Sequence, residues 1–174
     1  MLCRFGPGYN VEETLSISYD GNQPIEKKWG LFENGDDLFA VYSISPQVVL
    51  HIDGNNAAAF SVMNWNPTWF GGFLRGGASP ILVDNEYYCF FHGVIEKGED
   101  KVPKRIYTVG LYTFEAKPPF KPKRISPKPL LWPLEADRPG KLRVSVCFPS
   151  GAILRGGKWI VSYGYMDHEC RLAF

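Results

Sequence analysis

Strong charge, long apolar runs and helical periodicity are all scarce in this sequence. Its 19 Lys and Arg residues nearly balance its 18 Asp and Glu residues, so the formal net charge is only +1. This balance disfavours binding to nucleic acid or to an anionic membrane, which usually requires a strongly positive surface. The apolar runs are only a few residues long, too short to span a membrane. No stretch shows the apolar period of an ordinary amphipathic helix.

Metal-ligand spacing is also lacking. The four cysteines form no C-x-x-C pair, and their spacing fits no common metal site; they are Cys3, Cys89, Cys147 and Cys170. Two of them, Cys89 and Cys147, fall within apolar strand candidates, as expected for reduced thiols in a protein core. The first ten residues lack the apolar segment and cleavage site of a secretory signal. We therefore expect a cytoplasmic protein without a metal.

Glycine, proline and aromatic residues are abundant instead. The chain has 18 Gly, 14 Pro and 15% aromatic residues in 174 positions. Such frequent Gly and Pro punctuation favours many turns and few long helices. The length favours a single domain, which we place at residues 1–174.

A central stretch, residues 75–110, predicts three successive strands. The first two are joined by the tight turn Asp84-Asn85-Glu86, a strong hairpin signal. Proline is dense over residues 117–133, which favours an outer edge strand and its connection, with a polyproline recognition segment as the alternative. The strands expected along the whole chain are 14–19, 38–44, 48–52, 58–63, 79–83, 87–94, 106–112, 144–148, 152–154 and 159–165.

Three hairpins repeat one pattern: KWGLFENGDDLFAVYSIS, SPILVDNEYYCFFHGV and SGAILRGGKWIVSYGY. Each has a short apolar strand, a Gly, Asn or Asp turn, and an aromatic residue that opens the second strand. This recurrence predicts the blades of a β-propeller, whereas a β-sandwich would share the strands without the recurrence. We predict an all-β, partial propeller of about three blades, near residues 25–70, 71–135 and 136–174, with 1–24 as the remnant of a preceding blade.

Polar side chains occupy equivalent places in these repeats. The innermost strands of a propeller line a central channel, so polar groups from several blades converge there. Two of these polar residues, Arg75 and His92, are each followed by a glycine, which would let a ligand approach the backbone. Each residue also has a structural explanation, such as a core histidine or the cap of a turn. The candidates are Arg75, His92, Tyr107, Ser150 and Asp167.

Tryptophans such as Trp29 suit either the core or the apolar face of a sugar ring.

The motifs RGGASPILVDNEYYCFFHG, IYTVGLYTFE, KPLLWP, CFPSGAI, GKWIVSYGYMD and RLAF occur in this order. They resemble the C-terminal blades of the five-bladed propeller enzymes of glycoside hydrolase family 130, which are mannoside phosphorylases and related hydrolases. The upstream EKKWGLFENGDDLFAVYSISP resembles the preceding blade. The resemblance covers most of residues 25–174. Another five-bladed glycosidase family, such as the arabinanase-like group, is the alternative.

The resemblance implies a set of binding residues. His92 matches a family histidine that binds the attacking phosphate, and Tyr107 matches a tyrosine close to that phosphate. Arg75 falls near a basic residue with the same role, which is usually lysine in the family. Asp167 matches an aspartate that binds sugar hydroxyls. Two residues complete the predicted substrate-binding set on other grounds: Ser150 by its position in the repeat and Trp29 by its aromatic side chain. The implied substrate is an oligosaccharide or glycoside, with inorganic phosphate as co-substrate and no other cofactor.

The sequence also departs from the family pattern. The family's catalytic acid is an aspartate on an earlier blade, so no catalytic residue is assigned here. The arginine that the family places at the end of the Lys-x-Trp blade is replaced by residues 43–46, Ser-Ile-Ser-Pro, which carry no cation. We expect an incomplete propeller whose open sheet edges favour self-association. If active, it would be a glycoside phosphorylase, hydrolase or glycosyltransferase-like enzyme; the alternative is a non-catalytic module that binds glycan or protein.

Overall fold

The computed structural model describes residues 2–21, 28–70, 72–98, 104–134 and 144–174. Every regular element in these ranges is a β-strand, which confirms the all-β prediction. Accordingly, the described part of the chain contains no helix that is long and apolar enough to cross a membrane.

The first complete sheet has four antiparallel strands in simple order, β3–β4–β5–β6. Its hairpin turns contain Gly35 and Gly54, whose φ angles of 65° and 54° are left-handed and therefore favour glycine. Of the four strands, the last three extend those expected at 38–44, 48–52 and 58–63 by one or two residues, and the first is the short apolar strand of the first repeated hairpin. They are β3 (Gly30–Asn34), β4 (Asp37–Ile44), β5 (Gln47–Asp53) and β6 (Asn56–Met63).

The second group of strands follows the order β7–β9–β10–β11. Strands β7 and β8 both pair with β9, along its C-terminal and N-terminal parts respectively. The turn before β9 has φ values of 46° at Asp84 and 64° at Asn85, as a tight hairpin requires. The edge strand β11 confirms the interpretation of the proline-rich segment. These strands are β7 (Phe73–Gly77), β8 (Ile81–Val83), β9 (Glu86–Lys97), β10 (Lys104–Glu115) and β11 (Pro122–Ile125).

The C-terminal strands are β12 (Val144–Arg155), β13 (Lys158–Tyr165) and β14 (Glu169–Ala173). The break expected at residues 149–151 is instead a bulge within β12, and the strand continues through it. The start of β12 also pairs in parallel with the start of β10, so the two groups form one continuous sheet. This pairing exists because β11 covers only the end of β10, at residues 112–114, and leaves the start of that edge open.

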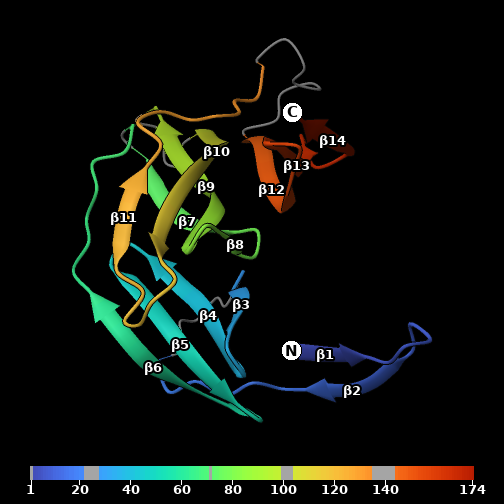
Figure 1. Ribbon diagram of the computed structural model, residues 1–174. Coiled ribbons are helices and arrows are strands. Elements are labelled where there is room, and N and C mark those ends of the chain that lie inside the picture. Colours follow the sequence, from blue (N-terminus) through green and yellow to red (C-terminus); the bar gives the residue numbers. More distant parts are fainter. Residues whose placement is uncertain (1, 22–27, 71, 99–103, 135–143) are drawn as a thin grey trace.

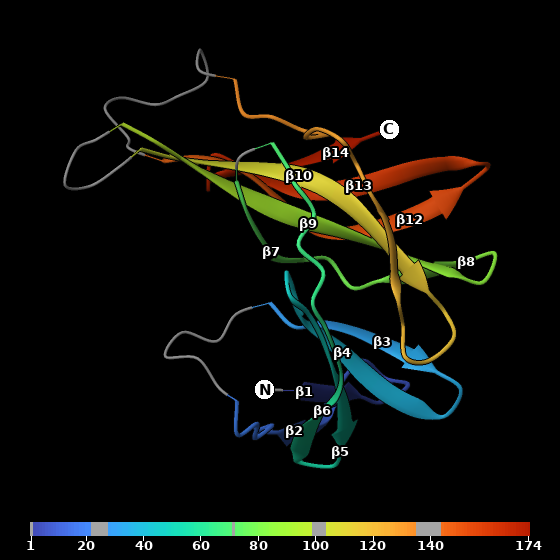
Figure 2. The ribbon, with the colours of Figure 1, turned by 90° about the vertical axis from the view of Figure 1, so that its left-hand side faces the viewer.

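The N-terminal hairpin consists of β1 (Leu2–Phe5) and β2 (Val11–Leu15), which pair with each other. The strand expected at residues 14–19 lies several residues earlier in the structure, as β2. After Leu15 only an isolated bridge, between Ser18 and Asn56, is formed up to residue 19. Figures 1 and 2 show the sheets arranged as an arc, with the hairpin at one end and β12–β14 at the other.

An aromatic core joins the first two groups of strands. Phe32 of β3 packs against Phe39 of β4 and against Tyr87 of β9, with ring centroids 5.6 Å and 4.7 Å apart. The Tyr87 hydroxyl donates a hydrogen bond of 2.5 Å to the carbonyl of Glu33. Neighbouring sheets therefore pack face to face, as blades of a propeller do.

Glu86 holds the edge strand β11 against the sheet. Its side chain is 8% exposed; its carboxylate accepts hydrogen bonds from Arg124, at 2.5 Å, and from Lys123. Burial would raise the pKa of Glu86, but the hydrogen bonds from Arg124 and Lys123 outweigh it and lower the pKa to about 2.

We expect Glu86→Gln to lower the free energy of unfolding by about 1–3 kcal/mol at pH 7, because both cations lose their charged acceptor. Since the folded-state pKa is lowered, the carboxylate stabilises the fold above pH 4.5 and loses this effect as the pH falls towards 2. Chemical denaturation at several pH values measures the difference. Glu96→Gln, in the exposed pair with Arg105, is the matched control and should cost less than about 1 kcal/mol. Equal losses in the two variants would contradict the assignment.

Candidate functional site

Five side chains that are distant in the sequence meet around His92, from strands β7, β9, β10 and β12 and from the residues before β3. His92 lies directly opposite Arg75 in the pairing of β9 with β7. Its ring stacks on Tyr107, with centroids 5.7 Å apart, and packs on Phe148 at 4.6 Å. The Lys28 Nζ lies 3.5 Å from the centre of the Phe148 ring. We term this group the His92 cluster: Lys28, Arg75, His92, Tyr107 and Phe148.

Strand register puts the three predicted phosphate ligands on one face of the sheet. Tyr107 lies opposite Val94, which is two residues from His92 and therefore shares its face. Arg75 lies opposite His92 and is exposed. The structure thus brings Arg75, His92 and Tyr107 together, and adds Lys28 and Phe148, which the sequence analysis did not select.

His92 is neutral at physiological pH. Burial lowers its pKa to about 4, and the positive charges of Lys28 and Arg75 contribute, although a hydrogen bond to the Gly76 carbonyl opposes the change. Because a carbonyl only accepts, the Nδ1 of His92 carries the proton and donates it to Gly76. The Nε2 atom is then an acceptor, suited to a hydroxyl of a sugar or to a protonated phosphate oxygen.

The glycines beside these residues serve protein packing, which corrects the expectation that they admit a ligand. A Cβ added to Gly93 would overlap the indole of Trp69, and one added to Gly76 would overlap the carbonyl oxygen of Lys28. Trp69 is only 3% exposed and its ring also covers Gly110. These glycines therefore do allow a close approach, but the group that approaches them is another part of the protein and not a ligand.

Asp167 lies outside the His92 cluster. It is exposed in the turn between β13 and β14, with a left-handed φ of 60°. The preceding Met166 donates its backbone N–H to Val146 at 2.8 Å, and Val146 lies opposite Tyr107 in the sheet. Met166, the residue before Asp167, is thus bonded to the strand that pairs with β10 at Tyr107. The left-handed conformation of Asp167 also fits the alternative that the sequence left open, a role in forming the turn.

The other two predicted substrate-binding residues are held by protein neighbours. Trp29 packs edge-on against Tyr42 and Tyr19, with ring centroids 5.7 Å and 6.3 Å apart. Ser150, at the β12 bulge, donates a hydrogen bond of 3.2 Å to the carbonyl of Ser162. Neither residue belongs to the His92 cluster.

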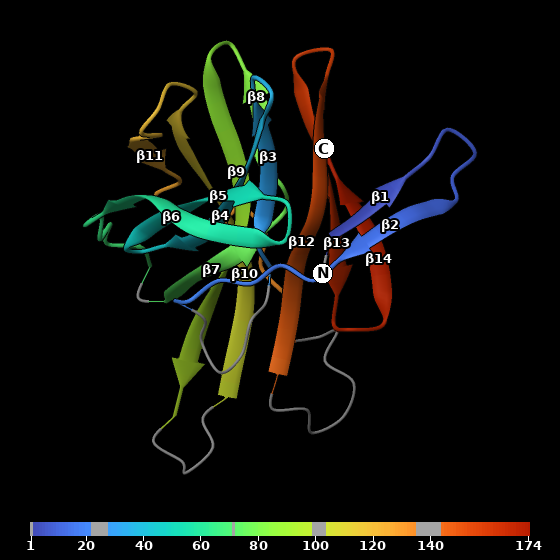
Figure 3. The same cartoon turned by 90° about the horizontal axis from the view of Figure 1, so that it is seen from below.

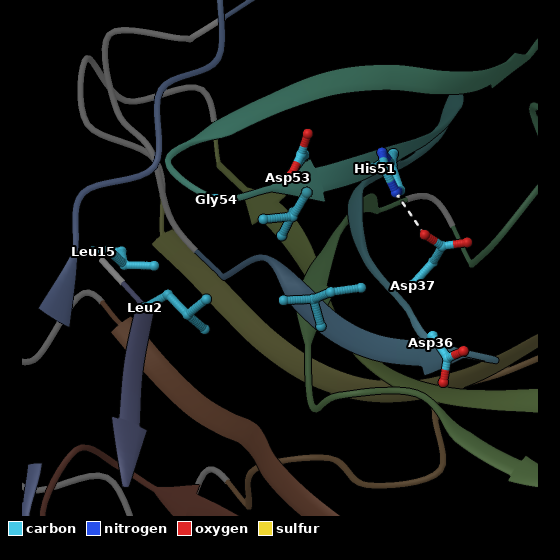
Figure 4. A pocket seen from close by; sticks show the side chains of 9 residues that line it. Leu2, Leu15, Asp36, Asp37, His51, Asp53 and Gly54 are labelled. Atoms are coloured by element: carbon cyan, nitrogen blue, oxygen red, sulfur yellow. Dashed lines mark hydrogen bonds and ion pairs between the residues drawn. The ribbon is translucent and has the colours of Figure 1, made fainter. Parts of the chain in front are cut away.

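A cavity of about 310 Å³ lies elsewhere, between the N-terminal hairpin and the turns of the first sheet (Figure 4). On one side the Nε2 of His51 lies 3.1 Å from the carboxylate of Asp37. None of the six predicted site residues lines it. Its lining is Leu2, Leu15, Asp36, Asp37, Leu38, His51, Ile52, Asp53 and Gly54.

The described residues hold no group of three or more His, Cys, Asp or Glu side chains that could bind a metal. Cys89 and Cys147 are buried, as expected from the sequence, and burial raises the pKa of both thiols to about 12. Neither is a thiolate nucleophile near neutral pH.

Solved structures share this fold, although no family model and no curated protein matches the sequence. A glycosyl hydrolase from Bacteroides ovatus aligns with a TM-score of 0.55 and 16% identity, over 91% of this chain and 46% of its own. A Parabacteroides distasonis protein inferred to be a glycoside hydrolase gives 0.56 and 18%, over 91% and 48%.

A third similar structure, with a TM-score of 0.52 and 16% identity, comes from work on the GH130 family of mannoside phosphorylases. That family contains glycoside hydrolases that target β-1,2-mannosidic linkages in Candida mannan. The alignment covers 91% of this chain and 46% of that one. The resemblance to the family 130 propellers is therefore confirmed at the level of the fold. The chain spans about half the length of the solved structures it matches.

Proposed function

We propose that this chain binds a glycan together with inorganic phosphate, and that the His92 cluster holds the phosphate. The observation that supports this is the meeting of two cations with the neutral His92: Arg75 lies opposite it on the adjacent strand β7, and Lys28, before β3, acts on it electrostatically. A phosphate needs cationic and hydrogen-bonding partners, and a guanidinium can grip it with two parallel hydrogen bonds. The Nε2 acceptor of His92 matches the remaining proton of a monoprotonated phosphate.

The glycan part of the proposal rests on the fold. Carbohydrate-active propellers share this arrangement of sheets, and Asp167 is an exposed carboxylate that can accept hydrogen bonds from sugar hydroxyls. The five side chains of the His92 cluster include no carboxylic acid. Inverting cleavage of a glycosidic bond needs such an acid on the leaving oxygen. We therefore propose that this chain alone binds its ligands without turnover.

Arg75→Ala should weaken the binding of inorganic phosphate about tenfold, because a charge-assisted hydrogen bond is lost from a partly desolvated site. Isothermal titration calorimetry with phosphate measures this. Arg155→Ala is the control, since Arg155 is an exposed arginine at the far end of β12. Absence of phosphate binding in the parent, or equal weakening in both variants, would overturn the assignment.

A panel of β-mannosides and other oligosaccharides tests the glycan site separately. We expect saturable binding, detected by ligand-observed NMR, that Asp167→Asn weakens, and no product release with or without phosphate. The result that rejects the glycan site is the lack of binding across the panel. Measurable phosphorolysis or hydrolysis by the purified chain would reject the absence of turnover.

A further inference from the structure

A β-bulge at Gly76 presents a backbone carbonyl to His92. The register between β7 and β9 shifts between Arg75 and Gly77, so Gly76 is an extra residue without a partner in the ladder. Its carbonyl instead accepts the hydrogen bond from the Nδ1 of His92. The bulge is held from its other side, because a Cβ added to Gly76 would overlap the carbonyl oxygen of Lys28. The bulge thus supplies a fixed acceptor that cannot donate in return.

The strands that carry the His92 cluster are neighbours in one sheet, in the order β7–β9–β10–β12 (Figure 3). Burial keeps the pKa of the imidazole low, and the positive charges of Lys28 and Arg75 act in the same direction. The ring also packs on Tyr107 and Phe148, which limits its rotation. The imidazole is therefore held neutral and in one orientation.

The second nitrogen of the ring, Nε2, is left with its lone pair. Among the described residues, only Gly76 is hydrogen-bonded to the His92 ring, and it takes the Nδ1 side. The Nε2 atom is not fully enclosed by the protein, although the residue as a whole is only 6% exposed. A small ligand can therefore reach an acceptor that lies within a cationic site.

An acceptor beside two cations distinguishes anions by their protons. Near neutral pH hydrogen phosphate and sulfate share a tetrahedral shape and a charge of 2−, but only hydrogen phosphate carries a hydrogen. Lys28 and Arg75 attract both anions through their charge. A protonated anion can donate to Nε2, whereas sulfate would place an oxygen lone pair against the nitrogen lone pair. Two acceptors that face each other lose water and gain no bond, which is costly.

We propose that His92 makes the anion site selective: the tautomer imposed by the Gly76 carbonyl admits tetrahedral anions that carry a proton, such as hydrogen phosphate and arsenate, and rejects sulfate. This selectivity rests on the proposed function, because it concerns the same anion in the same cluster. It keeps an abundant anion of equal charge from occupying the place of the phosphate.

Calorimetric titration of the purified chain with phosphate, arsenate and sulfate, slightly above neutral pH, tests the selectivity. Sulfate should bind at least about tenfold more weakly than the other two anions. His92→Gln should abolish this ratio, because an amide can turn either its donor or its acceptor towards the anion. Arg75→Ala is the control: it should weaken phosphate and sulfate alike and keep the ratio, because it removes charge only. Circular dichroism of each variant verifies folding.

The tautomer is measured without any ligand, by long-range correlation of the imidazole nitrogens and hydrogens in NMR. We expect the proton on the Nδ1 of His92, and a proton on Nε2 overturns the proposal. Equal binding of phosphate and sulfate by the parent, or a ratio that survives in His92→Gln, overturns the selectivity and leaves the anion site standing. If neither anion binds to the parent, the proposed phosphate site fails, and the selectivity fails with it.

Discussion

Replacing Gly93 with alanine should lower the free energy of unfolding by about 3 kcal/mol. An added Cβ would lie 2.5 Å from the Cη2 of Trp69 and still closer to the neighbouring ring atom, whereas real Cβ atoms essentially never come within 3.0 Å of another group. The indole cannot move away easily, because it is 3% exposed and packs on Phe91 with ring centroids 5.0 Å apart. The substitution therefore forces the core around β9 to rearrange.

Thermal and chemical denaturation measure this loss. Gly164→Ala, also within a strand, is the matched control, because the nearest atom to its added Cβ is the Phe148 carbonyl oxygen at 4.0 Å. It should change stability by no more than about 0.5 kcal/mol. Adding Trp69→Leu to Gly93→Ala should cost less than the sum of the two single losses, because the smaller side chain relieves the overlap. Additive losses would show that Trp69 is not the obstacle.

The stability of the protein should fall by about 3 kcal/mol as the pH drops from 6.5 to 4, through His92 alone. Burial lowers the folded-state pKa of His92 from 6.5 to about 4. Between these values the unfolded chain binds a proton that the folded protein does not, so acid favours unfolding. Above pH 6.5 the effect is constant, and each pH unit in the window corresponds to about 1.36 kcal/mol.

Urea denaturation between pH 4 and pH 7 measures this slope. His92→Gln should remove most of it, whatever its effect on stability at pH 7. His168→Gln, at an exposed histidine beside Glu169, should keep it. If the two variants show the same dependence between pH 4 and 6.5, then His92 is not the group that titrates. The test also bears on function, since a histidine that stays neutral at pH 7 acts at the proposed site as a hydrogen-bonding group and not as a cation.

The sequence by itself determined the local elements of this protein. Alternating apolar residues, Gly and Asx turns and clustered prolines predicted an all-β chain, the hairpins at Gly35 and at Asp84-Asn85, and the edge strand within residues 117–133. These features follow from neighbours a few residues away, because a left-handed turn residue or a missing N–H constrains the backbone wherever it occurs. The resemblance to the family 130 propellers likewise rested on short motifs in order. It could place Arg75, His92 and Tyr107 in one candidate site.

Only the tertiary structure decided which side chains meet there. Lys28 and Phe148 are distant in sequence from His92, and no local pattern marks them as its neighbours. The glycine beside His92 could have faced a ligand; the fold instead fills that space with Trp69. The parallel pairing of β12 with β10 depends on how far β11 extends. These outcomes depend on packing between segments far apart in the chain, which residue types and spacing leave undetermined.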